Sequence, residues 1–482
     1  MPRRLLHVSA ADGTALRVAL GELRAELEVP EGFPPEVLAE AREAAGAPRM
    51  PAYDGTAVEL FTLDPPGSVD LDQAMHLARR EGGGFRVHYA IADVAAFVTP
   101  GGALDAEAHR RVSTLYFPDK RVPLHPPELS EGAASLLPGQ ERPALLWRFD
   151  LDADGAVTAT DVRRAKVRSR ARLDYATVQH AIDTGTADEP VALLREIGTL
   201  REALEVARGG ISLNVPEQEI AERGGDYVLE YRAPRPADGW NAQISLLTGM
   251  AAADRMIRSG TGILRTLPSA PDGSVARLRR VAHALDVDWP EGTSYSAVIR
   301  SLDPRRETHA AFLQECTALL RGAGYTVFRS GETPEHTTHA AVAAPYTHCT
   351  APLRRLADRY AGEICLAAVA GTEPPGWVLD GLAALPRQMS EGAQRAHHVE
   401  RECVDLIEAA LLRDRVGEVF DAYVIDVRDG DPRAGTVHLD APAVVGRVQA
   451  PPGAPPLPLG HRLRVRLTAA APGRAKVMFA PA

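Results

Sequence analysis

The feature that most constrains this chain is a group of three aspartates arranged around a tight turn. Asp64 precedes the turn sequence Pro65-Pro-Gly, and Asp70 and Asp72 follow closely. A turn of this composition can fold Asp64 back against the other two aspartates. Crowded carboxylates repel one another, so such a group is costly unless a cation lies among them. The spacing therefore favours a metal site, with a solvated acidic loop as the alternative.

The residue types also indicate which metal such a site would hold. Carboxylate oxygens that leave room for water and phosphate suit Mg²⁺. A bound Mg²⁺ can activate a water molecule and clamp the phosphate that the water attacks. The three aspartates therefore point to chemistry on a phosphate group.

The pattern of helix and strand signals divides the chain into three parts. Residues 1–50 predict a small helical piece, because apolar residues recur at helical spacing from Thr14 to Leu27. Residues 51–412 mix strand and helix signals and predict one large domain of α/β or α+β type, which we assign to the α+β class. Residues 413–482 carry short alternating stretches separated by turns, which predicts a small β-barrel.

Within the central part, residues 85–92 predict a strand that becomes fully buried, and residues 149–167 predict a β-hairpin. The hairpin contains Asp150-Leu-Asp-Ala-Asp-Gly with Asp161 at the twelfth place, which imitates a calcium loop of the EF-hand type. An EF-hand needs a helix on each side, whereas both flanks here have strand character, so we prefer a hairpin turn. Helices are predicted at 242–257, 307–320 and 397–412.

Composition bounds the location of the protein more than its chemistry. The net charge of −10 does not exclude a nucleic-acid partner, because net charge does not describe a local site. No stretch reaches the roughly 20 apolar residues of a membrane span, and the N-terminal sequence has no signal-peptide core. We therefore expect a cytoplasmic protein without a membrane partner. The four cysteines form neither a C-x-x-C pair nor a disulfide framework, which indicates reduced thiols.

A second candidate site lies in Thr350-Ala-Pro-Leu-Arg-Arg, where a turn leads into a predicted helix. The start of a helix binds anions, and the fork of an arginine side chain suits phosphate. Arg354 and Arg355 are therefore candidate phosphate ligands, with ordinary surface arginines as the alternative.

These pieces, taken in order, resemble one family, the RNB exoribonucleases, which include ribonuclease II, ribonuclease R and their eukaryotic relatives. The resemblance covers roughly residues 51–412 and then the tail, which resembles the family's S1-like OB-fold. Each motif by itself is weak, but the ordered set is highly specific. The motifs are Asp64 to Ala74, Tyr89-Ala-Ile-Ala-Asp-Val-Ala-Ala-Phe-Val, Leu104-Asp-Ala-Glu-Ala, Ser113-Thr-Leu-Tyr-Phe-Pro-Asp-Lys-Arg-Val-Pro-Leu, Pro127-Glu-Leu-Ser, Arg208-Gly-Gly-Ile-Ser-Leu-Asn-Val-Pro-Glu, Tyr346-Thr-His-Cys-Thr-Ala-Pro-Leu-Arg-Arg-Leu-Ala-Asp and Glu400-Arg401.

The resemblance implies a processive, hydrolytic 3′→5′ exoribonuclease. It would use Mg²⁺, with Mn²⁺ as a substitute, and release nucleoside 5′-monophosphates from single-stranded RNA. Arg354 would stabilise charge on the phosphate in the transition state, and Tyr116 would stack on a terminal base. The implied catalytic residues are Asp70, Asp72 and Arg354, the implied metal ligands are Asp64, Asp70, Asp72 and Gln73, and the implied RNA contacts are Tyr116, Arg354, Arg355 and Glu400.

The chain departs from the family pattern in three ways. Gln73 stands where the family usually has a fourth aspartate, and an amide brings no charge to a metal. Ala351 and Leu356 replace the usual serine and tyrosine beside the arginine motif. Only 63 residues precede Asp64, too few for the two cold-shock barrels of bacterial members. A helix-turn-helix or winged-helix module would fit residues 1–50, and RNA with a short 3′ overhang would then reach the site more easily.

Three readings follow from these observations. The first is an active exoribonuclease, working as a monomer. The second is an RNB-like protein that binds RNA 3′ ends with weak or no catalysis, because Gln73 has altered the metal site. The third is a Mg²⁺-dependent phosphoesterase for small phosphates. The basic strand-like segment Arg462-Leu-Arg-Val-Arg disfavours the third reading, because it suits a polymeric substrate.

Overall fold

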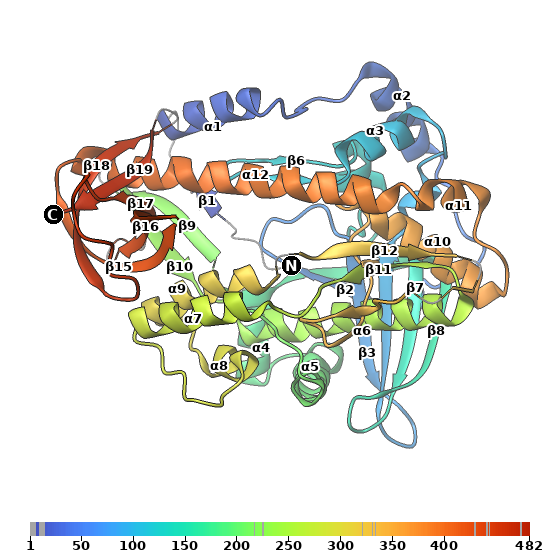
Figure 1. Cartoon of the computed structure of the whole chain (residues 1–482). Coiled ribbons are helices and arrows are strands. Elements are labelled where there is room, and N and C mark those ends of the chain that lie inside the picture. The colour runs from blue at the N-terminus through green and yellow to red at the C-terminus, as the bar shows by residue number, and fades with distance from the viewer. Residues whose placement is uncertain are drawn as a thin grey trace.

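In the computed structural model of this chain, the large middle part contains a closed five-stranded barrel, whose strands lie on the right in Figure 1. The structure describes residues 6–8 and 15–482, apart from positions 216, 224–225, 321, 330, 333, 429, 440–441, 443 and 473–474. Neighbouring strands of the barrel are antiparallel, except that β2 and β8 run parallel. In barrel order the strands are β2 (Leu60–Asp64), β3 (Gln73–Arg79), β4 (Phe85–Ala92), β7 (Glu141–Leu151) and β8 (Val157–Asp174).

Strand β4 shows why this barrel can carry helices on its surface. Its alternate residues from Phe85 to Ile91 pack in one apolar cluster, while Ala90 and Ala92 pack in another. Successive side chains of a strand point to opposite faces, so apolar residues on both faces bury the strand from Tyr89 to Ala92, while Arg86 and His88 before them are only partly buried. The structure confirms the strand predicted over 85–92. It also confirms the hairpin, in which Asp152 Oδ1 accepts hydrogen bonds from the backbone N–H groups of Asp154 and Ala156.

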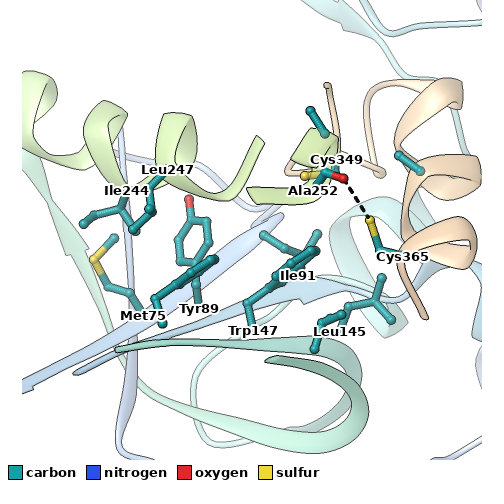
Figure 2. Close-up of a cluster of buried hydrophobic side chains, with 14 of the residues drawn as sticks. Met75, Tyr89, Ile91, Leu145, Trp147, Ile244, Leu247, Ala252, Cys349 and Cys365 are labelled. Atoms are coloured by element: carbon teal, nitrogen blue, oxygen red, sulfur yellow. Dashed lines mark hydrogen bonds between the residues drawn. The ribbon is translucent and has the colours of Figure 1, made fainter. Parts of the chain in front are cut away.

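Helix α6 covers one face of the barrel (Figure 2). Ile244 and Leu247 of this helix lie beside Met75, Tyr89 and Trp147 of the strands. All four cysteines are free, as predicted, and they are also buried. The Cys365 thiol lies 3.9 Å from the carbonyl oxygen of Ala252, and a dashed line marks this contact in Figure 2. The helices of the central part are α3 (Ala103–Arg111), α4 (Tyr175–Thr184), α5 (Glu189–Arg208), α6 (Pro236–Ser259), α7 (Asp272–Ala284), α8 (Tyr295–Ser301), α9 (Glu307–Cys316), α10 (Leu356–Ala370), α11 (Gly376–Leu382) and α12 (Leu385–Leu412).

The helices predicted at 242–257, 307–320 and 397–412 fall in α6, in α9 with the short 3₁₀ turn after it, and in α12. Among the residues that the structure describes, no helix has both the length and the apolar composition needed to cross a bilayer. Short strands complete the central part: β5 (Leu115–Tyr116) with β6 (Arg121–Val122), β9 (Glu217–Arg223) with β10 (Asp226–Arg232), β11 (Gly262–Thr266) with β12 (Gly324–Phe328), and β13 (Thr338–His339) with β14 (Ala344–Pro345).

The C-terminal part is a second closed barrel, which confirms the predicted small β-barrel. Helix α12 runs the length of the molecule to reach it, and Ala409 and Leu412 at the helix end belong to the core of the barrel (Figure 1). In barrel order the strands are β15 (Val419–Arg428), β16 (Asp431–Leu439), β17 (Val445–Gln449), β19 (Ala475–Pro481) and β18 (Arg462–Ala471).

The N-terminal part is helical, as predicted, but its two helices contribute to different cores. Helix α1 (Ala15–Glu26) packs against α12 and the β5–β6 hairpin. Helix α2 (Pro35–Gly46) packs against the first barrel instead. Strand β1 (Leu6–Val8) pairs in parallel with β9. Each helix buries its apolar face on the central part. The helix-turn-helix or winged-helix module considered for residues 1–50 stays a prediction.

Candidate active site

The aspartate loop lies between β2 and β3, where Asp64 is the last residue of one strand and Asp72 precedes the other. Gly67 has a φ of +81°, a backbone conformation that glycine adopts without strain. The hydroxyl of Ser135 accepts a hydrogen bond of 2.9 Å from the N–H of Leu71 and donates one of 2.7 Å to the carbonyl of Val69. The turn and this serine fold the loop so that Asp70 interacts electrostatically with both Asp64 and Asp72.

Asp72 joins the aspartate loop to the arginine motif. Its Oδ1 accepts a hydrogen bond of 2.8 Å from the backbone N–H of Leu353, and its Oδ2 lies 3.2 Å from Nε of Arg354. The Asp72 side chain is 6% exposed, whereas that of Arg354 is 48% exposed. The arginine therefore reaches from a buried carboxylate towards solvent, where a phosphate could meet it. The structure brings these two sequence-predicted residues together.

Burial shifts the protonation of two of the aspartates. Loss of solvent raises the pKa of Asp72 to about 8, although the nearby Arg354 opposes the shift. Loss of solvent likewise raises the pKa of Asp64 to about 6, again opposed by Arg354 and reinforced by the charge of Asp70. A carboxyl whose pKa approaches neutrality can exchange a proton with water under working conditions, which is a property of catalytic acids and bases.

Asp70 forms an ion pair with Arg121, a residue that the sequence analysis did not assign to the site. Arg121 donates to Asp70 Oδ1 and, at 2.9 Å, to Glu131 Oε1. Arg121 lies on β6 directly opposite Tyr116 on β5. Tyr116 in turn hydrogen-bonds to Arg354 and interacts with it electrostatically. The β5–β6 hairpin thus contacts both the aspartate loop and the arginine motif. The turn-forming sequence Pro118-Asp-Lys predicts a hairpin here, and a hairpin would have placed Arg121 beside Tyr116.

Gln73 is held at both ends of its amide. Its Nε2 donates a hydrogen bond of 2.6 Å to the carbonyl of Thr350, and its Oε1 accepts one from the Tyr89 hydroxyl. The amide oxygen, which would be the metal-ligating atom, therefore already has a donor. In this structure Gln73 links β3 to the start of the arginine motif, and its predicted role as a metal ligand stays a prediction.

Arg355 and Glu400 lie in different settings from Arg354. Arg355 forms a two-pronged pair with Asp358 at 2.6 and 2.8 Å, and the same carboxylate accepts a hydrogen bond from the N–H of Ala351. The guanidinium of Arg355 thus holds the motif in shape, and this geometry gives its predicted contact with RNA no support. Glu400 lies on α12, the helix that packs against β5.

The donor atoms suit a divalent cation that the protein holds only lightly. Asp64 Oδ2 is buried and accepts no hydrogen bond from the protein, so this oxygen is available to a cation. Arginines contact Asp70 and Asp72, and within the described residues no group of three His, Cys, Asp or Glu side chains is arranged to hold a metal. Mg²⁺ typically uses one or two carboxylates together with water and substrate phosphate, which matches this donor set better than a closed protein cage.

Comparison with known proteins defines the class of the chain. The RNB domain matches residues 53–370, and the RNase II-type exonuclease C-terminal S1 domain matches residues 418–482. Since the first match covers more than half of the chain, the protein belongs to the RNB family of exoribonucleases. The fold expected from the resemblance, a large α+β domain followed by an S1-like OB-fold barrel, is confirmed.

Particular relatives place the chain within that family. Ribonuclease R of Escherichia coli strain K12 is 28% identical over 416 residues, which are 80% of this chain and 50% of that protein. The chain therefore spans about half the length of this curated relative. The structure of Mycoplasma genitalium RNase R in complex with ribose methylated single-stranded RNA has a TM-score of 0.80 at 18% identity, over 97% of this chain and 78% of that one. The structure of yeast Ssd1, a pseudonuclease, has a TM-score of 0.65 at 18% identity, over 84% of this chain and 51% of that one.

Proposed function

We propose that this protein is a hydrolytic 3′→5′ exoribonuclease that degrades single-stranded RNA processively and releases nucleoside 5′-monophosphates. The observation that carries the proposal is the contact of Asp72 with Arg354, 3.2 Å apart, beside Asp64 and Asp70. This arrangement offers carboxylates for a cation and a water molecule on one side and a cationic fork for a phosphate on the other. The similarity to ribonuclease R supports the same assignment.

The residues divide the chemical work as follows. Arg354 binds a non-bridging oxygen of the scissile phosphate and stabilises the charge that grows there in the transition state. Asp72, held in place by the backbone N–H of Leu353, accepts a proton from the attacking water in its ionised form. Burial raises its pKa to about 8, and the nearby Arg354 favours the ionised form. Asp64, with help from Asp70, would hold Mg²⁺, which lowers the pKa of water and neutralises phosphate charge when bound.

The β5–β6 hairpin would select the RNA end. Tyr116 is partly exposed and stands next to Arg354, so a base stacked on its ring would place the adjoining phosphate at the guanidinium. Stacking on an aromatic ring accepts every base, which suits an enzyme that removes one nucleotide after another. A cytoplasmic location and a monomeric working form stay predictions.

A time course on 5′-labelled single-stranded RNA with Mg²⁺ tests this function, with Asp72→Asn as the matched variant. A ladder that shortens to a limit fragment, and is lost in Asp72→Asn, supports the proposal. RNA of the same sequence with its label at the 3′ end should release labelled mononucleotide from the first turnover. Cleavage at internal positions would contradict an exonuclease. Hydrolysis of a small phosphate ester without cleavage of RNA would favour a phosphoesterase.

The second candidate is an RNB-like protein that binds RNA 3′ ends with little or no catalysis. Two observations favour it: Gln73 stands where the family usually has an aspartate, and the yeast neighbour Ssd1 is a pseudonuclease. Intact RNA with Mg²⁺ and with Mn²⁺, together with retardation on a native gel, would select this candidate over the enzyme.

A further inference from the structure

The β5–β6 hairpin is too small to hold its own position. Each strand has two residues, and an isolated two-stranded hairpin is at best marginally stable in water. Its inner side meets the site through Tyr116 and Arg121, as described above. Its outer side, formed by the turn residues Phe117 to Lys120, must therefore be supported by another part of the chain.

Helix α1 supplies that support. Its apolar residues Leu16, Leu20 and Leu23 pack in one cluster with the hairpin and with α12. The hairpin contributes Leu115, Phe117 and Val122 to this cluster, and α12 contributes Val399, Cys403, Leu406, Ile407 and Ala410. The N-terminal helix is thus placed over the hairpin and over the helix that leads to the C-terminal barrel (Figure 1).

A buried ion pair fixes the helix to the hairpin turn. Arg24 Nη1 lies 2.8 and 3.0 Å from the two carboxylate oxygens of Asp119, and Arg24 Nε donates to Glu31 at 2.7 Å. The Arg24 side chain is 8% exposed and that of Asp119 is 10% exposed. The guanidinium also lies over the Phe117 ring, 5.3 Å from its centroid. Glu31 contacts the next turn residue as well, through Lys120.

Buried charges of this kind set geometry more than they add stability. A buried carboxylate that loses its arginine is strongly unfavourable, so Asp119 would move towards water if Arg24 were absent. Asp119 lies three residues after Tyr116 and two before Arg121. Any outward movement of the turn would therefore shift the residues that contact Arg354 and Asp70.

We infer that Arg24 is a positioning residue for the reaction: through Asp119, it sets the hairpin so that Tyr116 and Arg121 meet the RNA end and the aspartate loop. The inference rests on the proposed function. Helix α1 would then take part in substrate binding through the hairpin. None of the contacts described above joins α1 directly to the aspartates or to the arginine motif.

The test compares Arg24→Met, Asp119→Asn and the double variant in the full chain. Two controls accompany them. Arg17→Met removes an exposed arginine from the same helix. Leu278→Ala destabilises a separate apolar cluster, which shows what a loss of stability alone does to the kinetics. All variants are assayed well below their unfolding temperatures, with KM and kcat measured on single-stranded RNA.

We expect Arg24→Met to lower kcat/KM about tenfold, mainly through KM, because a base–aromatic contact contributes about that factor to binding. The double variant should cost no more than one single variant, since both remove the same interaction. Arg17→Met and Leu278→Ala should keep the wild-type KM. If Arg24→Met lowers the unfolding temperature but leaves KM and kcat at wild-type values, Arg24 is structural and the inference is wrong.

A binding measurement separates this inference from the proposed function. RNA with 2-aminopurine as its 3′-terminal base is titrated into the Asp72→Asn protein, with and without Arg24→Met. Stacking quenches this fluorophore, so loss of quenching in the double variant supports the inference whether or not the wild type cleaves. Equal quenching in both proteins overturns the inference alone. A wild-type protein that neither cleaves RNA nor binds its 3′ end overturns both.

Discussion

The carboxylate of Asp72 and the backbone N–H of Leu353 form a hydrogen bond of 2.8 Å, although 281 positions separate them in the sequence. The bond fixes the residue immediately before Arg354, and the other oxygen of Asp72 contacts Arg354 itself. One side chain therefore sets both the backbone and the guanidinium of the arginine motif. The two motifs act as one unit, so a change in either should affect the chemical step.

Arg354→Lys should distinguish the contribution of the forked guanidinium group from the contribution of its positive charge. Lysine keeps the charge but loses the planar pair of donors that matches a phosphate. We expect kcat to fall by about 10² to 10³, the loss typical of one transition-state donor, with little change in KM. Single-turnover cleavage of single-stranded RNA measures this fall in rate. Because the Arg354 side chain is half-exposed, its unfolding temperature should stay at the wild-type value. A variant with wild-type kcat would remove Arg354 from the mechanism.

Asp72 should make the metal-free protein less stable as pH rises. Its pKa is raised from an ordinary value near 3.8 to about 8. Below the ordinary value the carboxyl is neutral in both the folded and the unfolded chain. Between the two values the unfolded chain loses the proton more readily. The free energy of unfolding therefore falls by up to about 1.4 kcal/mol for each pH unit in this range, because of this group.

Urea unfolding in the presence of a chelator, at several pH values from about 5 to about 8, measures this dependence. Asp72→Asn cannot ionise but keeps an oxygen for the Leu353 N–H. It should unfold at a denaturant concentration that depends less on pH than that of the wild type. Identical pH dependence in the two proteins would show that Asp72 does not carry the shifted pKa.

Much of the fold and part of the site could be predicted from the sequence, because the signals were local. The turn after Asp64 and the apolar alternation in β4 depend on neighbouring residues, and the structure has both as predicted. The convergence of the aspartate and arginine motifs came from family resemblance. Spacing along the chain could not provide it, since a hydrogen bond between Asp72 and Leu353 has no local signal.

The rest of the site depends on which surfaces meet. Helical periodicity predicted α1, but not that its apolar face would cover the β5–β6 hairpin. Arg354 and Arg355 are adjacent and chemically identical, yet one points to solvent and the other to Asp358. The i, i+3 spacing of Arg355 and Asp358 was available as a signal for an ion pair. Only the packing of Asp358 shows that this pair is internal.

Gln73→Met should distinguish a structural amide from a metal ligand. The substitution keeps the side-chain length but removes the hydrogen bonds to Thr350 and Tyr89. Leaving buried polar groups unpaired should cost about 1–3 kcal/mol of stability, and kcat should fall because the arginine motif loses an attachment. We expect Mg²⁺ affinity, measured by isothermal titration calorimetry on the RNA-free protein, to stay unchanged. A marked loss of affinity would instead make Gln73 a ligand, as the family resemblance implies.

Arg355→Met tests whether the second arginine of the motif stabilises the fold, in contrast to the role in phosphate binding proposed for Arg354. The Asp358 side chain is fully buried, so loss of Arg355 leaves a buried carboxylate unpaired, at a cost of about 3–5 kcal/mol. Thermal and urea unfolding should show this loss. Arg354→Met should lose less stability, because burial already raises the pKa of its partner Asp72 to about 8 and that carboxyl can stay protonated. Adding Asp358→Asn to Arg355→Met removes the stranded charge, and the Asn oxygen can still accept from the Ala351 N–H. The double variant should therefore recover part of the stability. An Arg355→Met protein that unfolds like the wild type but binds RNA weakly would show that Arg355 acts on the substrate.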